Sequence, residues 1–162
     1  MLESIAVGYW GRMLATFILS MAPVVEVRGG IPFGAATGLD PLSCAAAAIL
    51  GNMLPVPFII LFIRKIFQWL KKFEFTAKIV NVLETKAYAK GHNIKKYEWI
   101  GLWLFVAVPL PGTGAWTGAL VAALLNMNFK RSISSIFVGV LTASIIVGAV
   151  TYGAIALAFL LV

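Results

Sequence analysis

The chain has 162 residues, of which 61% are hydrophobic and only 12% are charged, with a formal net charge of +7. Soluble domains carry roughly 45–50% apolar and about 25% charged residues, so this composition excludes an ordinary soluble protein and indicates a compact membrane domain. The basic residues are concentrated in residues 64–98 and in a short break at Lys130 and Arg131, both between apolar segments. This distribution argues against a nucleic-acid-binding face, which needs an exposed basic surface on a soluble scaffold.

The first element expected along the chain is a broken pair of short apolar runs. Residues 12–22 and 31–39 are each too short to cross a bilayer, which takes roughly 20 apolar residues. The stretch between them contains the helix breakers Pro23, Gly29, Gly30 and Pro32. We therefore expect a re-entrant hairpin, whose irregular tip must be covered by protein or line a watery cavity. We expect the first run to be retained, since the acidic Glu3 at its start is untypical of a signal peptide.

A long uncharged run from Leu42 to Ile63 predicts a transmembrane helix. The next stretch, residues 64–98, holds nine of the thirteen Lys and Arg residues. Apolar residues recur there every three or four positions from Ile66 to Ala87, which predicts a basic amphipathic helix in the membrane interface. A helix that docks a partner protein is the alternative for this stretch.

The second half repeats this order of elements. Residues 99–108 and 115–125 are again short apolar runs, and they predict a second re-entrant hairpin. The breakers between these runs are Pro109, Pro111, Gly112 and Gly114. The run from Ser132 onward is uncharged and longer than one span, so we expect a transmembrane helix with a break near Gly148 to Gly153.

The two halves align with each other. Placing Pro23 opposite Pro109 brings Asp40 opposite Asn126, with a two-residue slip following near Lys130. A hairpin adds no net crossing and a span adds one, so the second half starts on the opposite side of the membrane. The predicted fold is a single all-α polytopic membrane domain built as an inverted repeat of hairpin plus transmembrane helix. Its parts are residues 1–63, the basic linker 64–98, and residues 99–162.

Charge sets the expected orientation of this domain. Residues 64–98 and the turn at 126–131 share one face in this layout and carry eleven of the thirteen basic residues. By the positive-inside rule that face is cytoplasmic and both termini are outside. We expect the protein to be a multi-pass protein of the inner (cytoplasmic) membrane. Two spans and two hairpins are too few to shield a charged tip from lipid on all sides, so we expect a homodimer.

The first tip carries an acid and a base, Glu26 and Arg28, where charge is expensive. On a helix two such neighbours point in opposite directions, whereas in an extended segment they share a side. Gly29, Gly30 and Pro32 favour extended or unusual backbone, so we expect both side chains to face one cavity. There a desolvated Glu26 could exchange a proton beside a permanently charged Arg28. The alternative is an ion pair that only pins the tip.

The second tip offers backbone groups in place of charges. Gly112, Thr113 and Gly114 precede a helical run, where free N–H groups and the helix dipole would make an anion site. The alternative is that glycines spaced four apart, Gly30, Gly34 and Gly38 in the first half and Gly114 and Gly118 in the second, only let helices approach closely. Trp116 is either a substrate contact or a packing anchor.

The two motifs Pro23-x-x-Glu26-x-Arg28-Gly-Gly-Ile-Pro32 and Val108-Pro-Leu-Pro-Gly-Thr-Gly-Ala-Trp116-Thr-Gly118 resemble the signature pair of the small multidrug export protein family, within the wider DedA clan. The resemblance covers nearly the whole chain. It implies two inverted re-entrant hairpins, each followed by a transmembrane helix, and the activity of a membrane transporter. The DedA resemblance further implies a proton-dependent carrier of phosphorylated lipids, notably undecaprenyl phosphate.

We predict from this a transporter that moves an anionic lipid head group, such as a polyprenyl phosphate, coupled to protons or Na⁺. Its site would be Glu26 and Arg28 facing residues 111–116. A proton-linked exporter of lipophilic drugs, with Glu26 as the cation site, is one alternative. A non-transporting membrane assembly or docking protein is the other. The apolar part has no His and no metal-ligand cluster, so we expect no enzyme activity, no cofactor and no metal.

Overall fold

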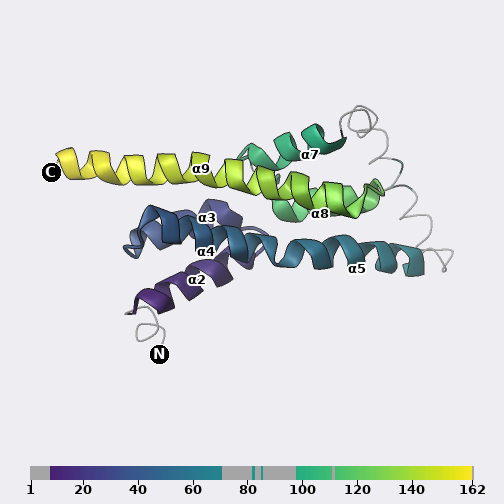
Figure 1. The fold of residues 1–162 in the computed structure, drawn as a ribbon, viewed down its shortest axis with the longest axis horizontal. Coiled ribbons are helices and arrows are strands. Elements are labelled where there is room, and N and C mark those ends of the chain that lie inside the picture. The colour runs from purple at the N-terminus through teal and green to yellow at the C-terminus, as the bar shows by residue number, and fades with distance from the viewer. Residues whose placement is uncertain (1–7, 71–81, 83–84, 86–97, 111, 162) are drawn as a thin grey trace.

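A computed structural model describes residues 8–70, 82, 85, 98–110 and 112–161. The described part is helical throughout and contains no strand, which confirms the all-α prediction. Figure 1 shows the course of the chain. The helices are α2 (Tyr9–Met21), α3 (Glu26–Ala36), α4 (Pro41–Met53), α5 (Pro55–Leu70), α7 (Glu98–Ala107), α8 (Ala115–Leu124) and α9 (Phe129–Leu161).

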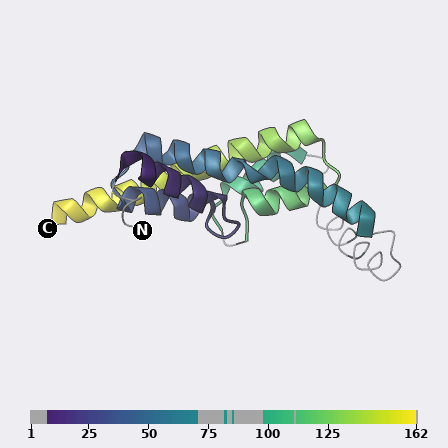
Figure 2. The same ribbon diagram turned by 90° about the horizontal axis from the view of Figure 1, so that it is seen from below.

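Two helical stretches are long and apolar enough to cross a membrane, Pro41–Ile63 and Phe129–Leu160. The first combines α4 with the start of α5, and Leu54 separates the two helices. Both stretches agree with the spans predicted from the sequence. They run in opposite directions and protrude past each other at opposite ends of the molecule (Figures 1 and 2).

The break expected within the last helix is absent, because α9 is continuous from Phe129 to Leu161. A Cβ added at Gly148 or Gly153 would meet nothing within 4 Å, so these glycines lie on an open face of a regular helix. A lone glycine weakens a helix by about 1 kcal/mol but leaves its hydrogen bonds intact, and no proline follows to remove one.

Each long stretch carries one pair of short helices. The α2–α3 pair lies at one end of the molecule and the α7–α8 pair at the other, with both tips meeting near the middle (Figure 1). In the first pair α2 packs on α4 and α3 on α9, while in the second pair α7 packs on α9 and α8 on α5. Each pair therefore touches both long stretches, and the tips are enclosed between them.

Small residues allow this close packing. A Cβ at Gly51 would overlap the backbone of Phe17, and one at Gly139 would lie 2.6 Å from Cβ of Val106. The close-packing interpretation of the glycines therefore holds at the helix contacts. It holds in α3 as well, where a Cβ on Gly30 would overlap Ser20 of α2.

The structure corrects the predicted position of the first break. Gly29, Gly30 and Pro32 lie inside α3, and the break spans residues 22–25, where Pro23 lies. The extended segment expected around Glu26 and Arg28 is thus wrong. Pro32 removes one backbone hydrogen bond from α3, but contacts with α2 through the glycine face hold the helix together, as membrane helices tolerate proline when neighbours support them.

The junctions that follow the two hairpins have matching hydrogen bonds. Asp40 caps α4 by accepting from the N–H of Ser43 at 2.9 Å, and Asn128 caps α9 by accepting from the N–H of Arg131 at 3.3 Å. These caps pair Asp40 with Asn128, two residues beyond Asn126, with which the sequence alignment paired it. The second tip loop (108–114) is also longer than the first (22–25), and the inverted repeat itself stays a prediction.

The basic linker is mostly beyond the described part of the chain. Helix α5 continues to Leu70, so the first residues of the predicted 66–87 helix belong to α5. The rest of that prediction lies outside the described residues, apart from the isolated positions Val82 and Thr85.

Candidate functional site

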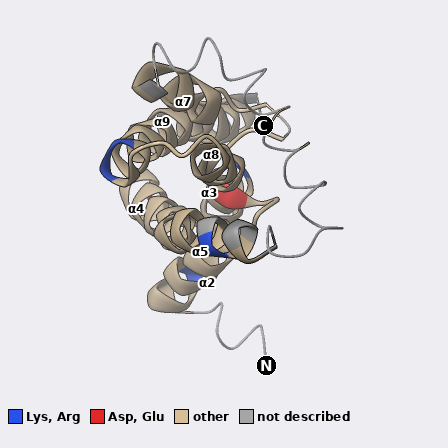
Figure 3. Ribbon diagram, turned by 90° about the vertical axis from the view of Figure 1, so that its right-hand side faces the viewer, with Lys and Arg blue, Asp and Glu red and all other residues tan. Residues whose placement is uncertain are grey.

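The candidate site lies where the two hairpin tips meet. Glu26 is the first residue of α3 and has a left-handed φ of 49°, which turns its side chain from the first tip toward the second. Viewed along the long axis of the molecule, the acidic segment beside α3 lies inside a ring of helices, and most of the described ribbon is uncharged (Figure 3). The acid is 3% exposed. A buried carboxylate needs hydrogen-bond donors, so its partners define the site.

The carboxylate of Glu26 caps α8, a helix of the other hairpin. The N–H of Trp116 donates to Oε1 of Glu26 at 3.1 Å. The first N–H groups of a helix have no partner within the helix, and the positive end of its dipole favours an anion. An N–H group at the start of α8 thus bonds to the protein's own carboxylate, whereas the anion site expected at Gly112, Thr113 and Gly114 stays a prediction.

Gly114 makes this approach possible. Its φ is +132°, and a Cβ on it would overlap the carboxylate of Glu26. Any other residue would add both a strained backbone and a clash with the acid. Gly112 also has a left-handed φ, of +80°, but a Cβ there would meet nothing within 4 Å.

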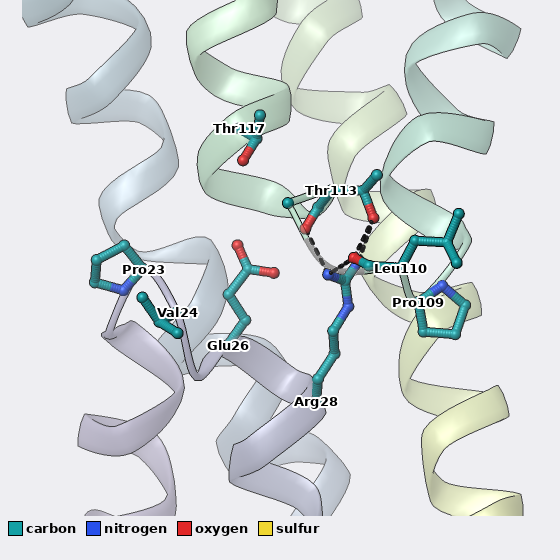
Figure 4. A pocket seen from close by; sticks show the side chains of 9 residues that line it. Pro23, Val24, Glu26, Arg28, Pro109, Leu110, Thr113 and Thr117 are labelled. Atoms are coloured by element: carbon teal, nitrogen blue, oxygen red, sulfur yellow. Dashed lines mark hydrogen bonds between the residues drawn. The ribbon is translucent and has the colours of Figure 1, made fainter.

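Arg28 is bound by backbone carbonyls of the second tip. Its guanidinium donates to the oxygens of Leu110 at 2.7 Å, Thr113 at 2.5 Å and Val108 at 3.1 Å, and to Oγ1 of Thr113 at 2.9 Å. Figure 4 shows the side chain reaching across to that loop. Both charges thus bond to groups of the opposite tip, which differs from the ion pair considered as an alternative.

Trp116 ties the tips together a second time. Its indole Nε1 donates to the backbone oxygen of Met21, the last residue of α2, at 3.0 Å. The side chain therefore acts as an anchor between the hairpins. Of the other predicted site residues, Gly112 and Pro109 lie at the meeting point, whereas Pro111 lies outside the described residues.

An open cavity of about 380 Å³ lies beside these contacts (Figure 4). Its lining is mainly apolar, with Glu26 and Arg28 as the charged members. The lining residues are Pro23, Val24, Glu26, Arg28, Pro109, Leu110, Gly112, Thr113 and Thr117. Sequence reasoning missed Val24, Leu110 and Thr117, for which closeness to the tip motifs was the available signal.

A second group of residues surrounds a narrow gap beside Glu26 that is too small to hold a water molecule. It includes Asn52 of α4, a side chain that is fully buried and has no hydrogen-bond partner on either amide atom. Nε of Arg28 is likewise buried without a partner. The other lining residues are Val27, Val106, Gly114, Ala115, Val140 and Ala143. Sequence reasoning missed Asn52, for which the available signal was a lone amide within an uncharged apolar run.

The described residues contain no group of three or more His, Cys, Asp or Glu that could hold a metal ion. The polar groups at the tips are one carboxylate, one guanidinium, one amide, the hydroxyls of Thr113 and Thr117, and the backbone.

Comparison with known families places this arrangement in context. The sequence model of the family described as "Putative small multi-drug export protein" matches residues 26–146. The chain belongs to this family. The match starts at Glu26, directly after the first tip (residues 22–25), and includes Glu26, Arg28, Asn52 and the whole second tip, so the small multi-drug export family shares most of the residues that build the site. No curated protein and no solved structure matches the chain. The family description, together with the two long apolar helices, indicates a membrane protein with a role in transport.

Proposed function

We propose that the protein is a proton-coupled exporter of lipophilic cations in which Glu26 is the exchanging carboxylate. The observation that carries this proposal is the position of Glu26 on a mainly apolar cavity of about 380 Å³. Ligand pockets of this size are typically apolar with a few polar groups that fix the ligand. An apolar wall with one buried acid suits a cation that carries hydrophobic groups.

The state of Arg28 supports a cation over an anion. Its four hydrogen bonds to the second tip direct the guanidinium at carbonyl and hydroxyl oxygens, which partly offset its charge. Glu26 then remains the charge available to a ligand. In its ionised form it attracts a cation, and in its protonated form it releases one, so that proton uptake and cation release alternate at one group.

The membrane arrangement belongs to this proposal. We place the two hairpins as re-entrant elements entering from opposite sides, so that the tips meet at mid-membrane as in transporters built from inverted repeats with broken helices. The opposed directions of the long stretches and the matching caps at Asp40 and Asn128 support it. Residues 64–98 are then cytoplasmic and both termini outside.

Labelling tests this topology. A cysteine replacing Gly8, where a Cβ meets nothing within 4 Å, should react only with an impermeant thiol reagent added outside. A cysteine replacing Asn93 should react only from the cytoplasm. Native Cys44 is buried and should stay unlabelled in both cases. Labelling of both engineered positions from one side contradicts the inverted arrangement.

A carrier of an anionic lipid phosphate, as in the DedA clan, is the second candidate. The observation that favours it is that Arg28 and the start of α8 lie together at the tips. A phosphate would have to displace Glu26 from the N–H of Trp116 and compete with the oxygens that now hold Arg28. The docking-protein alternative depends on residues 64–98, which lie largely outside the described part.

Reconstituted vesicles with an imposed pH gradient separate these candidates. We expect wild-type protein to move tetraphenylphosphonium against its gradient, and Glu26→Gln to reduce the pH-driven movement by at least tenfold. The matched control is Asp40→Asn, which removes the exposed acid that caps α4 at the end of the first hairpin away from the tips, and it should retain full transport. Equal transport by Glu26→Gln and wild type contradicts the proposal. Exchange of a polyprenyl phosphate without movement of the cation supports the second candidate.

A further inference from the structure

Asn52 is the polar group that the site described above leaves unused. It lies in α4 with 0% of its surface exposed, and neither Oδ1 nor Nδ2 has a hydrogen-bond partner. Burying an amide without partners is unfavourable, and in native proteins such a group calls for an explanation. The narrow gap that Asn52 lines is also lined by Glu26 and is too small for a water molecule, so the acid is the polar side chain next to the amide that can change its hydrogen bonding.

The fold itself does not require an amide at this position. Gly51 and Gly139 occupy matching places, each with its missing Cβ directed at a neighbouring hairpin helix. The residue after Gly139 is Val140, which is buried and lines the same gap opposite Asn52. An apolar side chain therefore suits the corresponding position of the second half, and packing alone does not explain why Asn52 is polar.

The chemistry of an amide matches a protonated carboxyl group. An ionised carboxylate only accepts hydrogen bonds, and at the start of α8 it finds a donor in the N–H of Trp116. A protonated carboxyl group has an O–H that needs an acceptor, and its loss of charge weakens its attraction to the helix dipole. An amide can accept that O–H through Oδ1 and donate through Nδ2 to the remaining carboxyl oxygen. Such a pair would satisfy both unpartnered atoms of Asn52.

We propose that Asn52 is the second partner of the Glu26 carboxyl, which leaves the start of α8 and bonds to the amide when it takes up a proton. This proposal deepens the proposed export function and rests on it. A hydronium ion supplies the proton, so one O–H bond breaks there to leave water and one forms on a carboxyl oxygen of Glu26, and no other covalent bond changes. The ionised acid faces the open cavity and binds a cation, whereas the protonated acid is withdrawn behind it.

The charged groups around this switch are few. Among the described residues that line the open cavity and the narrow gap, Glu26 and Arg28 are the charged members. Helices α4, α7, α8 and α9 contribute Asn52, Thr117 or apolar side chains to these linings and no titratable group. Arg28 stays protonated, so a pH response at the tips reports on Glu26.

Infrared difference spectroscopy of the full-length protein in vesicles tests the proposal without any transported ligand. The carbonyl stretch of a protonated carboxyl that disappears in Glu26→Gln identifies Glu26. We expect Asn52→Val to lower the pH midpoint of that signal by about 1 unit, because the protonated form loses its partner. If valine acted only by making the surroundings of Glu26 more apolar, it would disfavour the ionised acid and raise the pH midpoint. The sign of the shift therefore distinguishes loss of a hydrogen-bond partner from desolvation. An unchanged or raised midpoint overturns the proposal.

Two further variants make the result specific. Asn52→Gln keeps the amide, so its pH midpoint should lie closer to the wild-type value than that of Asn52→Val. Ser144→Ala removes a buried hydroxyl of α9 that bonds only within its own helix, to the oxygen of Val140, and should leave the midpoint unchanged.

Thermal unfolding at alkaline pH separates a coupling role from a structural one. Asn52→Val should unfold at a higher temperature than wild type, since it removes an unsatisfied buried amide. A lower unfolding temperature together with an unchanged midpoint would make Asn52 structural. If Glu26→Gln transports normally while Asn52→Val shifts the midpoint, the export function fails and the Glu26–Asn52 pairing stands.

Discussion

The two hairpin tips differ in what they supply. The first tip is a short break, residues 22–25, followed by an acid and a base, while the second is a longer loop, residues 108–114, with no charge. The second loop instead presents backbone oxygens to Arg28, and the helix after it presents an N–H to Glu26. Each tip is thus incomplete alone, and burial of the charges depends on docking of the hairpins. This difference predicts that changes to uncharged residues of the second tip should disturb the charges of the first.

Gly114→Ala should disturb the contact between the two tips more than any other substitution proposed below. It places a Cβ in the space of the Glu26 carboxylate and forces a left-handed backbone on alanine. Strain of this kind costs roughly 1–3 kcal/mol, and loss of the acid's donor costs about 1–3 kcal/mol more. We expect a clear drop in unfolding temperature in detergent. Gly112→Ala is the control, since it meets open space and should show the backbone penalty alone. Equal effects of the two variants would contradict the role given to Gly114.

Arg28→Lys should have the next largest effect. Lysine lacks the planar fork that bonds four acceptors at once, so we expect a loss of about 1–3 kcal/mol in unfolding free energy and faster amide hydrogen exchange over residues 108–114. Arg12→Lys is the matched control, because Arg12 donates one hydrogen bond, to the oxygen of Thr37, that lysine can replace. Unchanged exchange in the second tip of Arg28→Lys would show that the carbonyl contacts do not hold that loop.

Trp116→Phe tests the indole link between the hairpins. It keeps most of the ring and removes the hydrogen bond to Met21, which should cost about 1 kcal/mol. Trp103→Phe removes a comparable bond to Thr142 between α7 and α9 and should cost a similar amount. Only Trp116→Phe should alter the infrared signal of Glu26. The backbone N–H of residue 116 is the donor to the Glu26 carboxylate, and loss of the indole bond should shift that N–H. The same signal in both variants and wild type would limit Trp116 to packing.

The acid-dependent prediction concerns the cap at the far end of the first hairpin. Hydrogen bonds from Ser43 lower the pKa of Asp40 below its ordinary value of about 3.9. The stabilisation is therefore fully present above that ordinary value and is lost as the pH falls through the lower pKa of the folded state. Asp40→Asn should remove this acid limb from a plot of unfolding temperature between pH 2 and 5. It should leave the tips unaffected, so a changed infrared signal of Glu26 would contradict the independence of the two ends.

Assembly is the remaining test of how the charges are shielded. The later part of α9 exposes large apolar side chains, including Ile145 at 73% and Phe159 at 82%. We predict a two-fold homodimer, measured by light scattering in detergent, because one chain offers few helices to surround the tips. A stable monomer with full transport activity would contradict this.

The apolar runs by themselves determined the two long stretches, and the Pro and Gly motifs determined that a pair of short helices would precede each of them. These are local properties, since an uninterrupted apolar run of sufficient length has little alternative to a helix in a membrane. The same local rules placed the first break wrongly. Gly30 and Pro32 are breakers by propensity, yet contacts between α3 and α2 keep them helical, because packing overrides propensity.

The tertiary structure alone decided which groups bond to one another. Glu26 and Trp116 are 90 residues apart in the chain, and no local pattern shows that one caps the helix of the other. The same holds for Arg28 and the carbonyls of the second tip, and for Asn52 behind the acid. Hydropathy records how costly it is to bury a charge, whereas the partners that offset this cost depend on which helix ends the fold brings together.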